Sequence, residues 1–198
     1  MITFEMEQST EEWFAIKAGI PSASNFDKLL TVKGEPSKQR TKYMYTLAGE
    51  KITGKKEETY QNAAMTRGIE MEAEARNCYD MIKGYDVKQV GFCMDDNRQY
   101  GCSPDGLVSE DGLVEIKCPL MATQVGYLLE NKLPTDYFQQ CQGQLFVTGR
   151  KWLDFVSYFP GLKPFITRVT PDKKFHAALK KELDLFVTEL NEIAERIR

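Results

Sequence analysis

The sequence contains little histidine and no paired cysteines. Its 198 residues include one histidine, His176, and five cysteines without a Cys-x-x-Cys pair. That spacing excludes zinc ribbons, iron–sulfur clusters and disulfide frameworks, and it predicts reduced thiols in the core. We expect His176 to be a surface residue of the last helix. With no histidine partner for any cysteine, a thiol hydrolase is not indicated.

The chain also lacks a long apolar run and an excess of basic residues. No stretch approaches the ~18 apolar residues of a membrane helix, and glutamates 5, 7, 11 and 12 make the N-terminus too acidic for a signal peptide. We therefore expect a cytoplasmic protein without membrane contact. The formal net charge of −3 does not indicate a nucleic-acid binder. A metal site lined by carboxylates would carry such charge, which bound cations neutralise.

Length and periodicity predict one folded unit. The chain is long enough for a single substantial core, and we expect one domain over residues 1–198. The apolar patterns and the cap and turn signals predict alternating helices and strands. Helices are expected over about 10–18, 22–30, 43–54, 61–83, 121–131, 135–149 and 170–198, and strands over 87–94, two within 102–118, 152–159 and 165–170.

The most informative stretch is residues 102–118. A Ser-Glu-Asp-Gly turn signal at 109–112 separates two short apolar segments, which predicts a pair of strands joined by a turn. The period of two puts Glu115 and Lys117 on one face of the second strand, and Asp105 stands just before the first. Two carboxylates can hold a hard divalent cation, and a nearby lysine can position or deprotonate a water on it. This pattern indicates phosphodiester hydrolysis, with a structural ion-pair group as the alternative.

Several polar residues on the predicted helices are candidates for the same site. Glu72 and Glu74 lie on opposite flanks of the apolar stripe of helix 61–83, and periodicity does not choose between them. Helix 135–149 carries Gln139, Gln140, Gln142 and Gln144, which either bind a phosphate or a water or lie on the surface.

Two other segments have the composition of phosphate contacts. The hydroxyls of Ser22 and Ser24 stand at a helix start, where they either cap the helix or receive a phosphate. The polar segment 33–42 carries four basic residues, which either contact a DNA backbone or are solvated.

These motifs together resemble the PD-(D/E)xK nuclease superfamily, and more closely the lambda-type alkaline exonuclease family, also called YqaJ-like viral recombinases. The similarity covers nearly the whole chain. A bare Asp…Glu-x-Lys triplet is weak, but five motifs in order are specific. The matches are Trp13 with Gly19 and Ser22-Ala23-Ser24, then Gly68-x-x-x-Glu72-x-x-Ala75-Arg76, Ser103-Pro104-Asp105-Gly106, Glu115-Ile116-Lys117-Cys118-Pro119 and Tyr137-x-x-Gln140-x-Gln142.

The resemblance implies an α/β fold with a restriction-endonuclease-like core, in which helices flank a central mixed sheet. It also implies a catalytic set. Asp105, Glu115 and the backbone of Ile116 would bind Mg²⁺, as two ions for which Mn²⁺ substitutes. Lys117 would orient or activate the attacking water. Glu72 would add a carboxylate, directly or through water, and the side chain of Gln140 would assist from its helix.

The resemblance further implies how a DNA end is held. Ser24 and Ser103 would bind the terminal 5′-phosphate together with Lys17, and Tyr137 and Gln142 would contact DNA. The family has an arginine where this chain has Lys17. Lysine keeps the positive charge but loses the planar two-pronged grip on phosphate, so the sequence leaves the strength of any 5′-phosphate preference open.

The activity implied is digestion of one strand of linear duplex DNA in the 5′→3′ direction. It would leave 3′ single-stranded overhangs for a single-strand-annealing partner protein, and the enzyme would form a homotrimeric ring around DNA. A strand-separating wedge would come from segment 33–42 or from the region near Met65. The alternatives are an endonuclease of restriction type, a RecB-like nuclease domain, and a non-catalytic DNA-end-binding module.

Overall fold

The structure, a computed structural model, describes residues 1–57 and 63–198, without the side chains of residues 63–65 and 69. The side chain of Met65, one of the two predicted wedge positions, therefore lies outside the described part. In the ranges that are described, no helix is long and apolar enough to cross a membrane.

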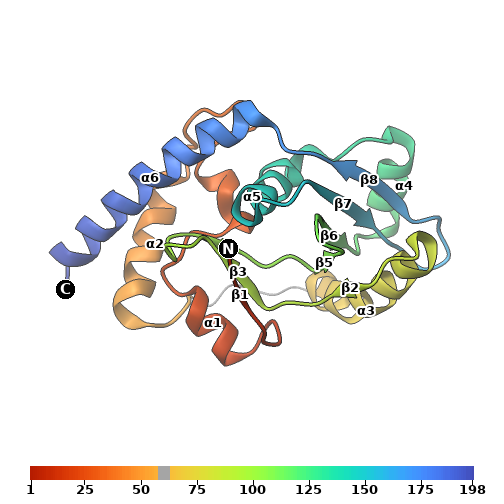
Figure 1. Cartoon of the computed structure of the whole chain (residues 1–198), viewed down its shortest axis with the longest axis horizontal. Helices are drawn as coiled ribbons and strands as arrows, with labels where there is room; N and C mark the ends of the chain where they lie inside the picture. The colour runs from red at the N-terminus through yellow and green to blue at the C-terminus, as the bar shows by residue number, and fades with distance from the viewer. Residues whose placement is uncertain (58–62) are drawn as a thin grey trace.

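The centre of the molecule is a five-stranded mixed sheet, ordered β2-β5-β6-β7-β8 (Figure 1). Strands β5 and β6 pair antiparallel, β6 and β7 parallel, and β7 and β8 antiparallel. A second sheet has the order β1-β3-β4. The strands are β1 Ile2–Phe4, β2 Val87–Lys88, β3 Phe92–Met94, β4 Gly101–Cys102, β5 Gly106–Val108, β6 Gly112–Lys117, β7 Trp152–Ser157 and β8 Phe165–Val169.

Helices cover both faces of the central sheet, so the predicted fold class is confirmed. The α-helices are α1 Glu11–Lys17, α2 Arg40–Thr53, α3 Ala63–Lys83, α4 Met121–Glu130, α5 Phe138–Thr148 and α6 Lys173–Arg196, with 3₁₀ turns η1 Ala23–Lys28 and η2 Thr135–Tyr137. On one face, Tyr79 of α3 packs with Val114 and Ile116 of β6. On the other, Leu113 of β6 joins the larger core that contains Leu145 of α5. The alternation of β6 therefore directs its odd-numbered residues toward α5.

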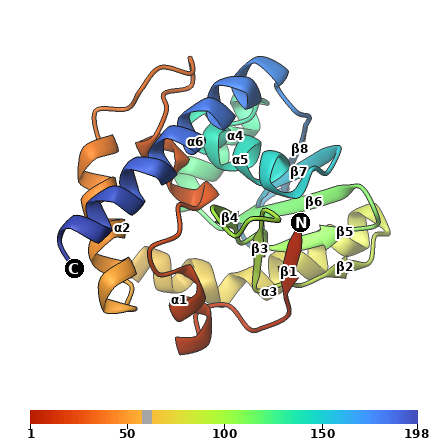
Figure 2. The same ribbon diagram turned by 60° about the vertical axis from the view of Figure 1, so that its left-hand side comes forward.

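Helix α6 packs on other helices. The apolar stripe in its sequence predicts packing on the sheet or on a neighbouring subunit, but in the structure that stripe contacts α2 and α5 (Figures 1 and 2). The Arg40 guanidinium of α2 is bound by Glu182 and Glu189 of α6. Arg40 thus forms ion pairs between two helices. It is therefore not available as one of the four cations of segment 33–42 that were proposed to contact DNA.

Cap signals located several helix ends correctly. The Thr10 hydroxyl accepts from the Trp13 amide at 3.3 Å, and Gly54 and Gly149 end α2 and α5 in the left-handed conformation. Two other signals are wrong: the sequence predicts Thr135-Asp136 as a helix cap and Pro171 as the first residue of the last helix. Residues 135–137 form a 3₁₀ turn without a side-chain cap, and the Asp172 carboxylate caps α6.

Other local predictions also fail. The segment after Ser22 is a 3₁₀ turn instead of an α-helix. Residues 87–94 form two strands in different sheets, because the extended segment is interrupted before β3. Gly91 lies in this interruption, packed so closely on Met6 that a Cβ atom would lie 2.3 Å from Met6 Cγ. Helical periodicity predicts that Ile52 and Ile82 face inward, but both are exposed.

Candidate active site

The β5–β6 hairpin brings Asp105, Glu115 and Lys117 together as predicted. Asp105 lies just before β5, and its Oδ2 accepts the backbone N–H of Ile116 at 2.6 Å. Lys117 Nζ lies 2.5 Å from Glu115 Oε1. The Glu115 side chain is 1% exposed, whereas that of Lys117 is 28% exposed. The hairpin therefore presents a buried carboxylate behind a partly accessible ammonium group.

Two glutamines of α5 fix the Glu115 carboxylate from the other side. Gln140 Nε2 donates to Oε1 at 2.6 Å, and Gln144 Nε2 donates to Oε2 at 2.5 Å. Both contacts follow from the four-residue spacing, which places the two amides on one helix face above β6. Gln144 was absent from the predicted catalytic set, although its shared face with Gln140 is visible in the sequence.

The charges at the hairpin are strongly interdependent. Burial and the neighbouring Glu115 carboxylate raise the pKa of Asp105 well above its usual range, against the opposing effect of Lys117. Burial alone would lower the pKa of Lys117, but Glu115 and Asp105 outweigh it and raise that pKa above its ordinary value. Lys117 is therefore an ammonium ion at neutral pH. Further positive charge beside Asp105 would stabilise the ionised form of its side chain.

Helix α3 resolves the choice between its two glutamates. The Glu74 carboxylate accepts from the Tyr158 hydroxyl at 2.6 Å and is thus occupied. Glu72 lies close enough to raise the pKa of Asp105, but its carboxylate pairs with Arg76 at 2.5 Å. Among the described residues, no three His, Cys, Asp or Glu side chains form a group that could hold a metal ion. Asp105 and Glu115 are the two carboxylates of the hairpin that could hold a hard divalent cation.

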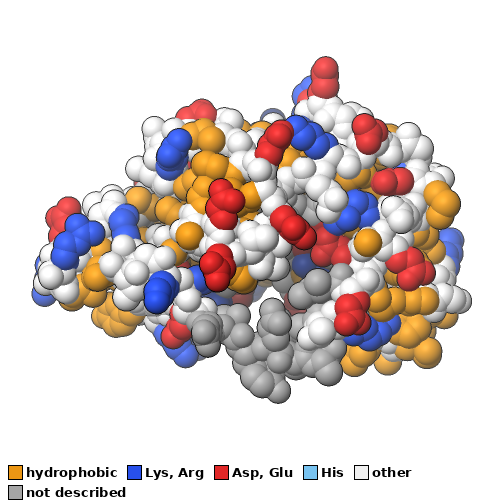
Figure 3. All heavy atoms as spheres, turned by 90° about the horizontal axis from the view of Figure 1, so that it is seen from below, with side chains coloured by type: hydrophobic (Ala, Val, Ile, Leu, Met, Phe, Trp, Pro, Cys, Tyr) orange, Lys and Arg blue, Asp and Glu red, His pale blue; other side chains and the backbone are white. Residues whose placement is uncertain are grey.

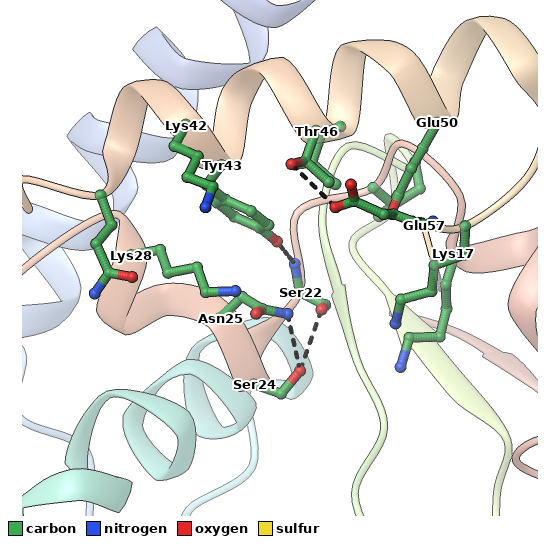
Figure 4. A pocket seen from close by; sticks show the side chains of 14 residues that line it. Lys17, Ser22, Ser24, Asn25, Lys28, Lys42, Tyr43, Thr46, Glu50 and Glu57 are labelled. Carbon is green, nitrogen blue, oxygen red and sulfur yellow. Dashed lines mark hydrogen bonds between the residues drawn. The ribbon is translucent and has the colours of Figure 1, made fainter. Parts of the chain in front are cut away.

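A cavity of about 510 Å³ lies between α1, η1 and α2 (Figure 4). Lys17 stands on one side, Lys28 and Lys42 stand on the other, and Ser24 lies between them. Lys17 Nζ donates to Ser103 Oγ at 3.3 Å, and Ser103 is two residues before Asp105. The predicted end-binding residues Lys17, Ser24 and Ser103 are therefore grouped, and Ser103 links them to the hairpin.

The Lys17 ammonium group lies in an unusual environment. Its side chain is only 5% exposed, and Nζ stands 3.5 Å from the centre of the Trp13 ring. Burial, and then the positive charge of Lys56, lower the pKa of Lys17 to about 7.

Some predicted polar residues have structural partners. Gln142 was assigned to DNA contact, but its side chain is 2% exposed, donates to the Thr170 carbonyl at 2.9 Å and accepts from the Asp172 amide at 2.8 Å. It therefore holds the start of α6. The Tyr137 ring remains beside the hairpin, with Lys117 Nζ 5.4 Å from its centre.

His176 is not the solvated surface residue that was expected. Its ring packs edge-on against Phe146 at 5.5 Å, and burial lowers its pKa. All five thiols are free, as predicted.

Charges of both signs are interspersed on the face shown in Figure 3. That distribution agrees with the net charge of −3. Attraction for an anion therefore depends on local groups, such as the lysines of the cavity in Figure 4.

Comparison with known proteins identifies the relatives of this arrangement. Residues 12–151 match the model of the YqaJ-like viral recombinase domain. The chain belongs to the YqaJ-like viral recombinase family. It is 37% identical to an alkaline exonuclease from Laribacter hongkongensis over 95% of this chain and 96% of that one, with a TM-score of 0.86. The same figures hold for that exonuclease crystallised with dAMP.

A more distant structural neighbour of this YqaJ-like chain shows the fold alone. It is a phage-related exonuclease from Haemophilus somnus, 13% identical over 90% of this chain and 96% of that one, with a TM-score of 0.69. Among curated proteins, no sequence matches the chain. The recognised family and the PD-(D/E)xK fold class are thus confirmed.

Proposed function

We propose that this YqaJ-like protein is a metal-dependent exonuclease that digests one strand of linear duplex DNA in the 5′→3′ direction and leaves 3′ single-stranded overhangs. The observation that carries the proposal is the short link between two sites. Ser103 Oγ accepts a hydrogen bond from Lys17 Nζ, which lines the cavity, and Asp105 of the carboxylate pair follows Ser103 by two residues. The 37% identity to an alkaline exonuclease, which has also been crystallised with a nucleoside monophosphate, supports the same activity.

The catalytic roles follow from the contacts of the hairpin. Asp105, Glu115 and the backbone carbonyl of Ile116 would hold Mg²⁺, with Mn²⁺ as a substitute and a second ion reached from Glu72 through water. Bound cations would polarise the scissile phosphate and lower the pKa of a water molecule. The hydrogen bonds from Gln140 and Gln144, which lie four residues apart on α5, fix the orientation of the Glu115 carboxylate.

Lys117 acts as a positioned ammonium group. Since Glu115 and Asp105 raise its pKa, it carries a proton at neutral pH and can donate hydrogen bonds to the attacking water or to a phosphate oxygen. We assign it to orientation and charge stabilisation, the first of the two roles considered from the sequence.

Direction of digestion would come from the cavity. A 5′-phosphate held by Lys17 and Ser24 of the cavity and by Ser103, which contacts Lys17, would lie near the hairpin, and the first phosphodiester of that strand would then face Asp105. Tyr137, beside Lys117, would contact the terminal nucleotide. We further propose, from the family, a homotrimer acting in the cytoplasm with a single-strand-annealing protein.

Digestion of linear and circular duplexes tests the activity. With Mg²⁺, the linear duplex should be degraded and the circle left intact, and EDTA should stop the reaction. Asp105→Asn should abolish degradation, while Asp111→Asn, an exposed carboxylate in the same hairpin that pairs with Lys151, should retain it. Cutting of the circle would instead identify an endonuclease, and binding without cutting in any divalent metal would identify an end-binding module.

A further inference from the structure

Two of the lysines that line the cavity, Lys17 and Lys56, lie close to the same aromatic ring, that of Trp13. Lys17 Nζ lies 3.5 Å and Lys56 Nζ 5.6 Å from the centre of the Trp13 ring. Lys17 is buried and Lys56 half-buried, and after burial the positive charge of Lys56 is the next cause of the depressed Lys17 pKa. In the part of the chain that is described, neither ammonium group has a carboxylate within salt-bridge distance.

A buried carboxylate holds this pair in place without neutralising it directly. Glu50 is 5% exposed, and its Oε2 accepts the amide of Gly19, two residues after Lys17, at 3.0 Å. Its Oε1 accepts the amide of Glu57, the residue after Lys56, also at 3.0 Å. One side chain of α2 thus ties together the two backbone segments that carry the lysines. The Glu50 carboxylate offsets part of the repulsion between the two lysines, since it acts to raise the pKa of each, and an anion bound between them would offset more of it.

We propose that Lys56 is a second phosphate-binding cation of this cavity, acting with Lys17 to recognise the 5′-phosphate of a DNA strand. This assignment rests on the proposed exonuclease function. Two ammonium groups approaching from different segments would supply the charge and the two directions of hydrogen bonding that a single guanidinium supplies through its fork. The pair would therefore supply the two-pronged grip on a 5′-phosphate that Lys17 alone lacks.

The surroundings of Lys56 favour an anion over a cation or a neutral ligand. Lys28 and Lys42 also line the cavity, and the carboxylates that line it are those of Glu50 and Glu57. Glu50 is already bonded to two backbone amides, and Glu57 accepts from the Thr46 hydroxyl at 3.4 Å. Both carboxylates are thus engaged, and the lysine ammonium groups remain for a ligand.

The test compares digestion of two linear duplexes that differ only in a 5′-phosphate or a 5′-hydroxyl. For each variant, kcat/KM is measured on both duplexes in Mg²⁺, and their ratio is the readout. Lys56→Met keeps the length of the side chain and removes its charge, and Lys56→Arg keeps the charge. Lys55→Met is the matched control, because Lys55 is exposed and does not line the cavity.

We expect Lys56→Met to lower the phosphate-to-hydroxyl ratio by about tenfold, the loss typical of one charge-assisted contact, and Lys56→Arg and Lys55→Met to leave it within twofold. Digestion of the 5′-hydroxyl duplex shows that each variant is folded. An unchanged ratio, or an equal loss on both duplexes, would overturn the assignment of Lys56. Failure of the unmodified protein to degrade either duplex would instead refute the proposed function.

Discussion

The pH dependence of end recognition follows from the environment of Lys17. Its ammonium group is enclosed by the Trp13 and Phe92 rings, and it faces Lys56 from the segment after α2, Glu50 from α2, and Cys102 and Ser103 from the β4 segment. Burial, followed by Lys56, lowers its pKa to about 7. Only the protonated form attracts a phosphate, so affinity for a 5′-phosphate should fall as the pH rises through 7.

The size of the effect follows from that pKa. If binding requires protonated Lys17, the dissociation constant scales with 1 + 10^(pH − pKa), so between pH 7 and pH 8.5 affinity should weaken about fifteenfold. The phosphate itself contributes little in this window, since a phosphate monoester with a second pKa of about 6 is already largely dianionic there.

Fluorescence anisotropy on duplexes with a 5′-phosphate or a 5′-hydroxyl, without divalent metal, measures this directly. As the pH rises, the dissociation constant for the 5′-phosphate duplex should approach that for the 5′-hydroxyl duplex. Lys17→Arg should make the ratio independent of pH, because arginine stays protonated throughout. A ratio that is flat between pH 7 and 8.5 in the unmodified protein, or equally steep in Lys17→Arg, would refute the titration of Lys17 as its cause.

Three further predictions concern the hairpin. Lys117→Ala should lower cleavage by about 10²–10³-fold while duplex binding persists, and Lys151→Ala, an exposed lysine, should change neither; retained cleavage in Lys117→Ala would remove this lysine from the mechanism. Gln144→Leu should lower the free energy of unfolding by about 1.5–3 kcal/mol and also lower kcat. Gln139→Leu, which removes a hydrogen bond to the Leu30 carbonyl, should lower stability alone. Equal kcat values for the two variants would contradict a role of Gln144 in positioning Glu115. Mg²⁺ at about 100 times its Kd should raise Tm by about 5–10 °C, and Asp105→Asn should remove that rise; an unchanged Tm in the unmodified protein would argue against a site at Asp105.

Local signals predicted the hairpin because everything that defines it is close in sequence. The turn at 109–112 and the alternation of 113–117 set both the pairing of β5 with β6 and the shared face of Glu115 and Lys117. The caps at Thr10 and Gly149 succeeded for the same reason. By contrast, the division of 87–94 into two strands depends on the distant contact of Gly91 with Met6, which no local pattern contains.

The roles of the α5 glutamines show a different limit. Four similar side chains lie within six residues, but Gln140 and Gln144 bind Glu115, Gln142 binds the start of α6, and Gln139 binds the Leu30 carbonyl. Each role depends on what packs against that side of the helix. Periodicity identified the shared face of Gln140 and Gln144, but only the tertiary structure shows that this face meets β6.

The position of Lys56 beside Lys17 could not be predicted from the sequence, for a related reason. Lys56 stands 39 residues after Lys17, and the two meet because Glu50 binds both flanking backbone segments. Nothing in the local composition distinguishes Lys56 from its exposed neighbour Lys55.

Digestion of a linear duplex labelled in turn at each 5′ and 3′ end tests the central claim most directly. The account predicts that in Mg²⁺ a 5′ label appears first as a mononucleotide, while a 3′ label stays in a long single strand. It also predicts faster release from a 5′-phosphate than from a 5′-hydroxyl end. Early release of the 3′ label as mononucleotide would contradict the proposed direction and the assignment of the lysine and serine cavity to the 5′ end.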